Sequence, residues 1–150
     1  MNRKEWVFRA IGYVRSRFTE WTEADVMRQE VSELVLDPEF VEGLEGLQPG
    51  DILMVIYVLD RVTESRLKVH PRGDHTKPMK GVFATRSQYR PNPIGLTGVR
   101  VLAIEGNVVR VQGLDALDGS PILDLKIASD LDRPPDPRPE DLEIGSHPFQ

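Results

Sequence analysis

The feature that most constrains this chain is a pair of apolar segments joined by a two-residue turn. Residues 94–105 are rich in valine and leucine, and Gly106-Asn107 is a natural hairpin turn into residues 108–112. Other short apolar stretches are separated by turn residues, and we expect strands at residues 7–15, 31–36, 52–59, 67–70, 82–85 and 123–128. This succession predicts a mainly β fold, a small antiparallel β-barrel, closed or nearly closed, with one short helix.

Local signals place the helix and a long loop. Asp37 is a good N-cap and Pro38 suits the first helical position, so a short helix should begin there. Residues 17–30 are polar and have no clean period, which predicts a long loop. The run 52–59 is continuously apolar except for Tyr57, as is typical of a buried strand.

Length and composition indicate one domain followed by a tail. The chain of 150 residues can bury a core of its own, which we place at residues 1–129, and prolines alternating with charges predict an extended tail at residues 130–150. The absence of cysteine excludes disulfides, thiolate metal sites and a cysteine nucleophile, and three histidines without ligand spacing argue against bound metal. Without a membrane-spanning run or a signal-peptide pattern, a soluble cytoplasmic protein is expected.

The net charge of −5 is unevenly distributed along the chain. Between Arg61 and Arg100, nine lysines and arginines stand against Glu64 and Asp74, which gives a local charge of +7 and leaves −12 for the rest. A basic segment in an acidic frame is what a local phosphate-binding surface needs. The alternative is that these charges lie on opposite faces and cancel against acidic neighbours.

Residues 81–96 carry the most distinctive motif, Gly-Val-Phe-Ala-Thr-Arg-Ser-Gln-Tyr-Arg-Pro-Asn-Pro-Ile-Gly-Leu. Arg86 and Arg90 flank a polar turn, and the two prolines that follow remove backbone donors and stiffen the chain. Two guanidinium groups on a stiff backbone suit binding of a carboxylate, a phosphate or an aromatic group. The alternative is a rigid surface loop between two strands.

This motif closely resembles the signature of the TsaA/TrmO family, S-adenosylmethionine-dependent methyltransferases that act on tRNA without a Rossmann fold. Similar blocks occur in the family's order at Ile11-Gly-Tyr-Val-Arg-Ser16, Gly43-Leu-Glu-Gly-Leu47 and Gly113-Leu-Asp-Ala-Leu-Asp-Gly-Ser-Pro-Ile-Leu-Asp-Leu-Lys126. The resemblance therefore runs from residue 11 to residue 126. It implies S-adenosylmethionine as cofactor, tRNA as partner, a β-barrel fold and a homodimer.

The resemblance also implies a cofactor site, which must form without a glycine-rich G-x-G-x-x-G turn or a P-loop. The positions that match the family's cofactor motifs are Met27, Arg28, Gln29, Asp60, Arg61, Arg86, Leu96, Leu117, Asp118, Gly119 and Ser120. Arg28 or Arg86 could hold the cofactor's carboxylate with two hydrogen bonds, and Asp118 and Ser120 could serve its ribose or amino end. Taken singly, Arg28 could be a solvated loop residue, Leu96 a core residue, and residues 117–120 a plain hairpin turn.

Methyl transfer from a sulfonium depends mainly on holding the nucleophile in line, and needs no metal. An amine nucleophile must also lose a proton, for which Asp118, Asp124 and Lys126 are the unranked candidates. Asp124 and Lys126 alternate on one strand face and could equally form an ion pair. The positions expected to contact the methyl acceptor are Arg72, Arg90 and Asn92.

The resemblance implies methylation of the exocyclic amine of threonylcarbamoyl-adenosine beside a tRNA anticodon. Three departures from the family pattern motivate alternatives: Asp60-Arg61 in place of His-Gln, Ile127-Ala128 in place of Pro-Tyr, and a proline-rich tail instead of an extra domain. The alternatives are methylation of a small molecule or a protein, and a non-catalytic S-adenosylmethionine-binding module.

Overall fold

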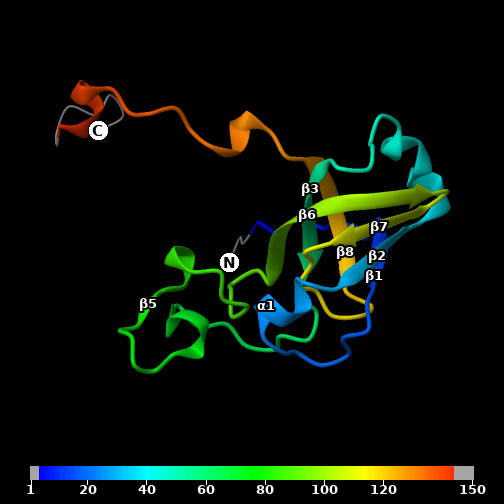
Figure 1. The fold of residues 1–150 in the computed structure, drawn as a ribbon. Coiled ribbons are helices and arrows are strands. Elements are labelled where there is room, and N and C mark those ends of the chain that lie inside the picture. The colour runs from blue at the N-terminus through cyan, green and yellow to red at the C-terminus, as the bar shows by residue number, and fades with distance from the viewer. Residues whose placement is uncertain (1–3, 144–150) are drawn as a thin grey trace.

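The computed structural model describes residues 4–143, and its centre is a β-barrel (Figure 1). Six strands form the barrel in the spatial order β1 (Gly12–Arg15), β2 (Val31–Leu36), β7 (Val108–Gln112), β6 (Ile94–Glu105), β3 (Ile52–Val58) and β8 (Pro121–Ile127). All neighbouring strands are antiparallel, and β8 pairs with β1 to close the barrel. The predicted mainly β fold and antiparallel barrel are confirmed.

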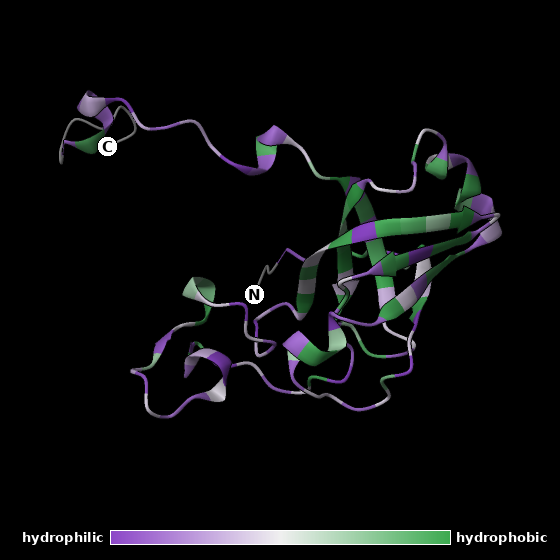
Figure 2. Ribbon diagram, viewed as in Figure 1, coloured by the Kyte–Doolittle hydropathy of each residue, from purple (hydrophilic) through white to green (hydrophobic). Residues whose placement is uncertain are grey.

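Alternating burial along the strands fills the barrel with aliphatic side chains. In β3, Leu53, Val55 and Tyr57 point inward and are at most 3% exposed. The core also contains Val14, Leu34, Leu36, Val99, Val101, Val109, Val111, Leu114 and Ile122. Figure 2 shows the contrast between the largely apolar barrel strands and the mainly hydrophilic C-terminal segment.

The β6–β7 hairpin forms where the sequence predicted it. Gly106 has a φ of 58°, in the left-handed region that glycine tolerates best. Asn107 fixes the turn because its Nδ2 donates a hydrogen bond to the Leu36 carbonyl at 2.7 Å. The bounds of β6, β7 and β2 match the prediction, and those of β3 and β8 differ by one or two residues at their ends.

Three predicted strands are wrong in whole or in part, and two of them concern residues 82–85 and 7–15. Residues 82–85 form the 3₁₀ turn η3 (Val82–Ala84), because the backbone N–H and the hydroxyl of Thr85 both donate to the Val82 carbonyl, at 3.1 and 2.9 Å. In the first segment only β1 is a strand. Its ladder ends where the N–H of Asp37 donates to the Ile11 carbonyl at 2.8 Å, because the pairing segment then turns into the 3₁₀ helix that begins at Pro38.

Shorter elements complete the described structure. Helix α1 (Ala24–Met27) interrupts the predicted loop, because the buried Met27 gives this segment an apolar anchor, and the expected helix is the 3₁₀ helix η1 (Pro38–Leu44). The strand predicted at residues 67–70 is reduced to β4 (Lys68–Val69), which pairs with β5 (Lys80–Gly81). The remaining 3₁₀ turns are η2 (Pro71–Gly73), η4 (Asp130–Asp132) and η5 (Pro139–Leu142).

Two segments project from the barrel in Figure 1. Residues 59–93, here called the insert, leave after β3, form a lobe near α1, and return at β6. The described part of the predicted tail runs away from the barrel with η4 and η5 along it, and residues 144–150 lie outside the described residues. The boundary between domain and tail at residue 129 stays a prediction.

Candidate functional site

One mouth of the barrel collects the segments that carry the predicted cofactor site. Strands β1, β3 and β7 end at this mouth, and β2, β6 and β8 begin there, because neighbouring strands are antiparallel. The connections at this mouth are residues 16–30, the insert and residues 113–120. All predicted cofactor residues lie on these connections or, for Leu96, near the start of β6. The fold therefore brings them to one end of the barrel.

The acidic turn, residues 115–120, lies across this mouth. Gly119 has a φ of 84°, and the Ser120 N–H donates to the Leu117 carbonyl at 3.1 Å. The Ser120 hydroxyl donates to the same carbonyl at 2.7 Å, and Ser120 is buried. Asp118 Oδ1 accepts a hydrogen bond from the Ser16 N–H at 2.9 Å, which fastens the turn to the end of β1. Residues 117–120 thus form a turn, but the turn is not a hairpin, because β7 and β8 are not neighbours in the barrel.

Arg61 joins three segments of the mouth. Its guanidinium donates to the carbonyls of Asp118 and Thr19, the latter at 3.3 Å. Arg61 also lines a small cavity of about 30 Å³ together with Trp21, Tyr57, Gln88, Leu117 and Ser120. The cavity adjoins a cleft of about 400 Å³ that shares Trp21, Arg61, Gln88 and Leu117 with it and is also lined by Tyr89 and Glu64. A volume of this order is typical of small-molecule sites, for which about 300–1,000 Å³ is usual.

The motif loop is shaped by its two arginines. Arg90 Nη1 donates to the carbonyls of Val82, Thr85 and Ser87, at 3.3, 3.1 and 3.1 Å. Arg86 is exposed, and its Nη2 donates to the Leu96 carbonyl at 2.5 Å. Both guanidinium groups hold the loop, and Arg86 also lies at the edge of the mouth.

Gly95 of the motif is needed for close packing. A Cβ at Gly95 would lie 2.4 Å from the Tyr57 ring, closer than non-bonded carbon atoms approach. The ring of Tyr57 therefore covers the backbone of its partner residue in β6. Leu96, the next residue, faces outward and is 41% exposed, so it is not a core residue.

Tyr57, Thr97 and Asp115 form a polar cluster just inside the mouth. The Tyr57 hydroxyl donates to Asp115 Oδ1 at 3.0 Å, and the Thr97 hydroxyl donates to the same oxygen at 2.6 Å. Burial raises the pKa of Tyr57 well above its usual value, and the negative charge of Asp115 raises this pKa further. A hydrogen bond with Thr97 and the positive charge of Arg86 oppose the rise. Tyr57 is therefore a neutral hydrogen-bond donor throughout the physiological pH range.

The loop between β1 and β2 places Met27, Arg28 and Gln29 along the same mouth. Met27 is completely buried, whereas Arg28 is exposed and its Nε donates to the Gly113 carbonyl at 3.0 Å. The Gln29 carbonyl accepts a hydrogen bond of 3.4 Å from Gln112 Nε2.

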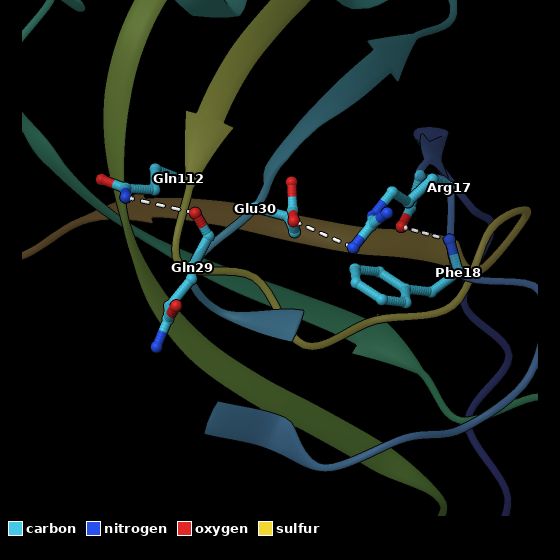
Figure 3. A network of polar contacts seen from close by, with 6 residues as sticks. Arg17, Phe18, Gln29, Glu30 and Gln112 are labelled. Carbon is cyan, nitrogen blue, oxygen red and sulfur yellow. Dashed lines mark hydrogen bonds and ion pairs between the residues drawn. The ribbon is translucent and has the colours of Figure 1, made fainter. Parts of the chain in front are cut away.

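Figure 3 shows the contact between Gln112 and Gln29. Beside it lies the ion pair that closes the loop, between Arg17 Nη2 and Glu30 Oε1 at 2.9 Å. The Arg17 guanidinium also lies 4.8 Å from the centre of the Phe18 ring. The first contact joins the loop to β7, and the ion pair joins the two ends of the loop.

Neither the cavity nor the cleft is lined by the predicted site residues Asp124, Lys126, Arg72 and Asn92. Asp124 and Lys126 are exposed on the outer face of β8, and no ion pair joins them among the described residues. Arg72 lies on the insert, where it contacts Asp25 Oδ2 at 3.5 Å and has a φ of 54°. Asn92 is exposed in the motif loop. The structure thus gathers the predicted cofactor residues more closely than the predicted catalytic and substrate residues.

Four side chains of this mouth were not singled out as site residues from the sequence: Trp21, Thr97, and the hydrogen-bonded pair Tyr57 and Asp115. Two signals pointed to the pair, because Tyr57 is the single polar side chain of its run and Asp115 opens the acidic turn. Within residues 4–143 no group of three or more histidine or acidic side chains is placed to hold a metal ion. None of the helices in this range is long and apolar enough to cross a membrane.

Comparison with known proteins identifies the family. The model of the tRNA-methyltransferase O N-terminal domain matches residues 13–130. The chain belongs to this family. The resemblance seen in the sequence is confirmed, and with it, at the level of the family, the expected methyltransferase class and S-adenosylmethionine as cofactor.

Individual relatives are consistent with this family assignment. The S-adenosyl-L-methionine-binding protein of Archaeoglobus fulgidus is 40% identical over 125 residues, which cover 80% of this chain and 87% of that protein. The probable S-adenosyl-L-methionine-binding protein of Methanocaldococcus jannaschii is 50% identical over 101 residues, or 64% of this chain and 80% of that one. The crystal structure of TrmO from Pseudomonas aeruginosa superposes with a TM-score of 0.68 at 30% identity, covering 90% of this chain. The match spans 62% of that TrmO chain.

Proposed function

We propose that this protein uses S-adenosylmethionine to methylate the exocyclic amine of threonylcarbamoyl-adenosine next to a tRNA anticodon. Membership of a family named for a tRNA methyltransferase supports the class of reaction. The observation that carries the proposal is the barrel mouth, where the cofactor motifs converge beside the basic insert.

The residues at the mouth fit the chemistry of the cofactor. Trp21 and Leu117 line the cleft with the flat and apolar surfaces that an adenine ring needs. Arg86 offers a permanent positive charge for a carboxylate, and Asp115 offers a negative charge for a cationic group. When bound there, S-adenosylmethionine supplies the electrophilic methyl group. The chain's own task is to hold the acceptor amine in line and exclude competing water.

Proton removal from the acceptor amine falls to a carboxylate at the mouth or to water. Asp118 lies on the acidic turn with Oδ1 held by the Ser16 N–H, so its position is fixed. Asp124 and Lys126 face outward from β8 and are less well placed. Asp118 is accordingly the preferred candidate of the three.

The insert supports an RNA partner. Lys68, Lys77 and Lys80 are exposed, and no ion pair is formed by them within the described chain. Arg66 pairs with Glu64 at 2.7 Å and lies 4.3 Å from the centre of the Tyr89 ring. Lysines without acidic partners are suited to phosphate contacts, whose strength falls as salt rises.

The decisive experiment uses labelled cofactor with two tRNA pools, one with and one without the threonylcarbamoyl modification. Label that enters only the modified pool, at the modified adenosine, is the expected result. Label in both pools would move the methyl to another nucleotide. Retained cofactor binding without label in either pool would reject tRNA as the acceptor.

A second candidate is methylation of a small molecule or a protein. It is favoured by the cleft itself, in which Glu20 and Glu64 lie near Arg61 and would disfavour a phosphate but suit an amine. Asp60-Arg61, at the position where the family commonly has His-Gln, points the same way. Transfer of label to small amines or to peptides, with none to tRNA, would support this candidate.

We also propose that the protein works as a homodimer in the cytoplasm, where tRNA is available. Large apolar side chains are left exposed, among them Trp6 at 78%, Phe8 at 74% and Phe83 at 77%. A second copy that covers them would remove this surface from water. Sedimentation analysis tests this, and a monomer that binds cofactor at full strength would contradict it.

A further inference from the structure

Asp115 is held in place from two sides. Its Oδ1 accepts the hydroxyl of Tyr57 from β3 at 3.0 Å and the hydroxyl of Thr97 from β6 at 2.6 Å. Tyr57 is 3% exposed and Thr97 is 7% exposed, so both donors come from the packed interior. Two buried donors on one oxygen fix the orientation of the whole carboxylate.

The other oxygen of this carboxylate is left open. Oδ2 of Asp115 receives no hydrogen bond from the described residues, and no lysine, arginine or histidine among them forms an ion pair with Asp115. No side-chain polar atom in this part of the chain is both buried and unpaired, so Oδ2 keeps some exposed surface. A half-buried carboxylate without a cation is costly, and a cationic ligand would complete it.

Two other polar side chains of the acidic turn each make a bond that shapes the turn. Asp118 Oδ1 accepts the Ser16 N–H, and the Ser120 hydroxyl donates to the Leu117 carbonyl while Ser120 is 3% exposed. Asp118 and Ser120 therefore help to form the turn. Asp115 is the better candidate for the amino end of a ligand.

A positive group lies near the same cluster. Arg86 donates to the carbonyl of Leu96, the residue before Thr97, and its charge acts on Tyr57, which bonds Asp115. A guanidinium and a carboxylate near one cluster match the two charges of an α-amino acid. Of the two positive groups in S-adenosylmethionine, the α-ammonium has N–H donors and the sulfonium has none, so an open acceptor oxygen selects the ammonium.

We propose that Asp115 binds the α-ammonium group of S-adenosylmethionine through Oδ2, with Tyr57 and Thr97 as positioning residues. This inference rests on the cofactor of the proposed function and does not depend on which molecule accepts the methyl. It predicts that Asp115 distinguishes ligands by their amino-acid end.

The test is calorimetric titration of Asp115→Asn with two ligands, S-adenosylmethionine and 5′-methylthioadenosine, which lacks the amino-acid end. Loss of a charged hydrogen bond should weaken S-adenosylmethionine binding roughly 10- to 100-fold and leave methylthioadenosine within about twofold of the unchanged protein. Equal loss for both ligands would overturn the proposal and make Asp115 a structural residue. No loss for either would also overturn it.

Matched variants complete the design. Thr97→Val and Tyr57→Phe each remove one donor and should give smaller, ligand-selective losses, and Thr97→Ser should restore the hydroxyl and the affinity. Asp51→Asn is the control, because Asp51 Oδ2 accepts the Gln48 N–H at 2.9 Å at the opposite mouth, and it should change neither ligand.

A measurement on the unchanged protein guards against a variant that fails to fold. The deamino analogue of S-adenosylhomocysteine should bind at least about tenfold more weakly than S-adenosylhomocysteine itself. Equal affinities, or no binding of S-adenosylmethionine at all, would overturn the proposal. Normal selective binding with no methyl transfer to tRNA would instead refute the proposed acceptor and leave Asp115 in its role.

Discussion

The barrel and the insert are held together by different kinds of interaction. In the barrel every strand pairs with two neighbours, and buried aliphatic side chains fill the interior. In the insert, the only strands within the described chain are the two-residue β4 and β5, and a single guanidinium, that of Arg90, binds three carbonyls of the motif loop. The stability of the barrel is therefore spread over many contacts, whereas the conformation of the motif loop depends on a few side chains.

The largest expected difference concerns buried side chains. Leu34 in β2 is completely buried, and Leu34→Ala should lower the free energy of unfolding by about 2–5 kcal/mol through lost packing and a cavity. Leu67 in the insert is 68% exposed, and Leu67→Ala should change the free energy of unfolding by less than about 0.5 kcal/mol. Urea unfolding of both variants measures this. Similar losses in the two would mean that the insert packs as tightly as the barrel.

Arg86 should affect binding and leave the barrel unchanged. If it holds the cofactor's carboxylate, Arg86→Ala should weaken S-adenosylmethionine binding by about 1.5–3 kcal/mol, and Arg86→Lys by less, because lysine keeps the charge without the planar fork. Arg100→Ala is the matched control, since Arg100 also donates to one carbonyl, that of Gly50 at 3.1 Å, at the opposite mouth. Calorimetric titration in which Arg86 and Arg100 variants behave alike would remove Arg86 from the cofactor site.

A substitution at Arg90 tests whether the stability of the motif loop is independent of the barrel. Arg90→Ala removes a donor from three carbonyls, of which that of Val82 keeps its bonds from Thr85, and this should destabilise the loop by about 1–2 kcal/mol. Hydrogen exchange should then quicken at the Val82 and Thr85 amides, by roughly tenfold, and stay unchanged in β3 and β7. Faster exchange throughout the barrel would contradict the separation of the two regions.

The smallest expected effect is a pH dependence of stability at Tyr57, near the end of β3 where the insert begins. Tyr57 has a pKa above its ordinary value of 10.0, mainly because of burial and the charge of Asp115. Its contribution to stability is therefore complete below about pH 10 and declines as the pH rises further. The free energy of unfolding should fall more steeply from about pH 9 to about pH 11 in the unchanged protein than in Tyr57→Phe. Parallel curves would mean that Tyr57 ionises alike in the folded and unfolded chain.

Much of the barrel could be predicted because its signals are local. The β6–β7 hairpin follows from Gly106-Asn107 and the valines around it, all within one short stretch. Residues 82–85 have strand-forming composition, yet the loop carbonyls turn toward Arg90, which the composition of four residues does not reveal. Strand β1 is short because the segment that pairs with it turns into η1 at Pro38. The composition of residues 7–11 does not reveal this.

The candidate site was predictable where a motif marks it. The segments predicted to bind the cofactor could be named from the resemblance, and the fold places them at one mouth. The outward direction of Asp124 depends on a register shift between β3 and β8, which alternation alone does not fix. The meeting of Tyr57 with Asp115 joins residues 58 positions apart, so only the folded barrel shows it.

The position of β8 has a consequence for folding during synthesis. This strand lies between β1 and β3 in the barrel, although it is the last of the six to be made. Until it emerges from the ribosome, β1 and β3 each present an unpaired edge, which invites association with other chains. We therefore expect nascent chains stalled before Pro121 to need chaperone protection, and those stalled well after Ile127 to resist proteases.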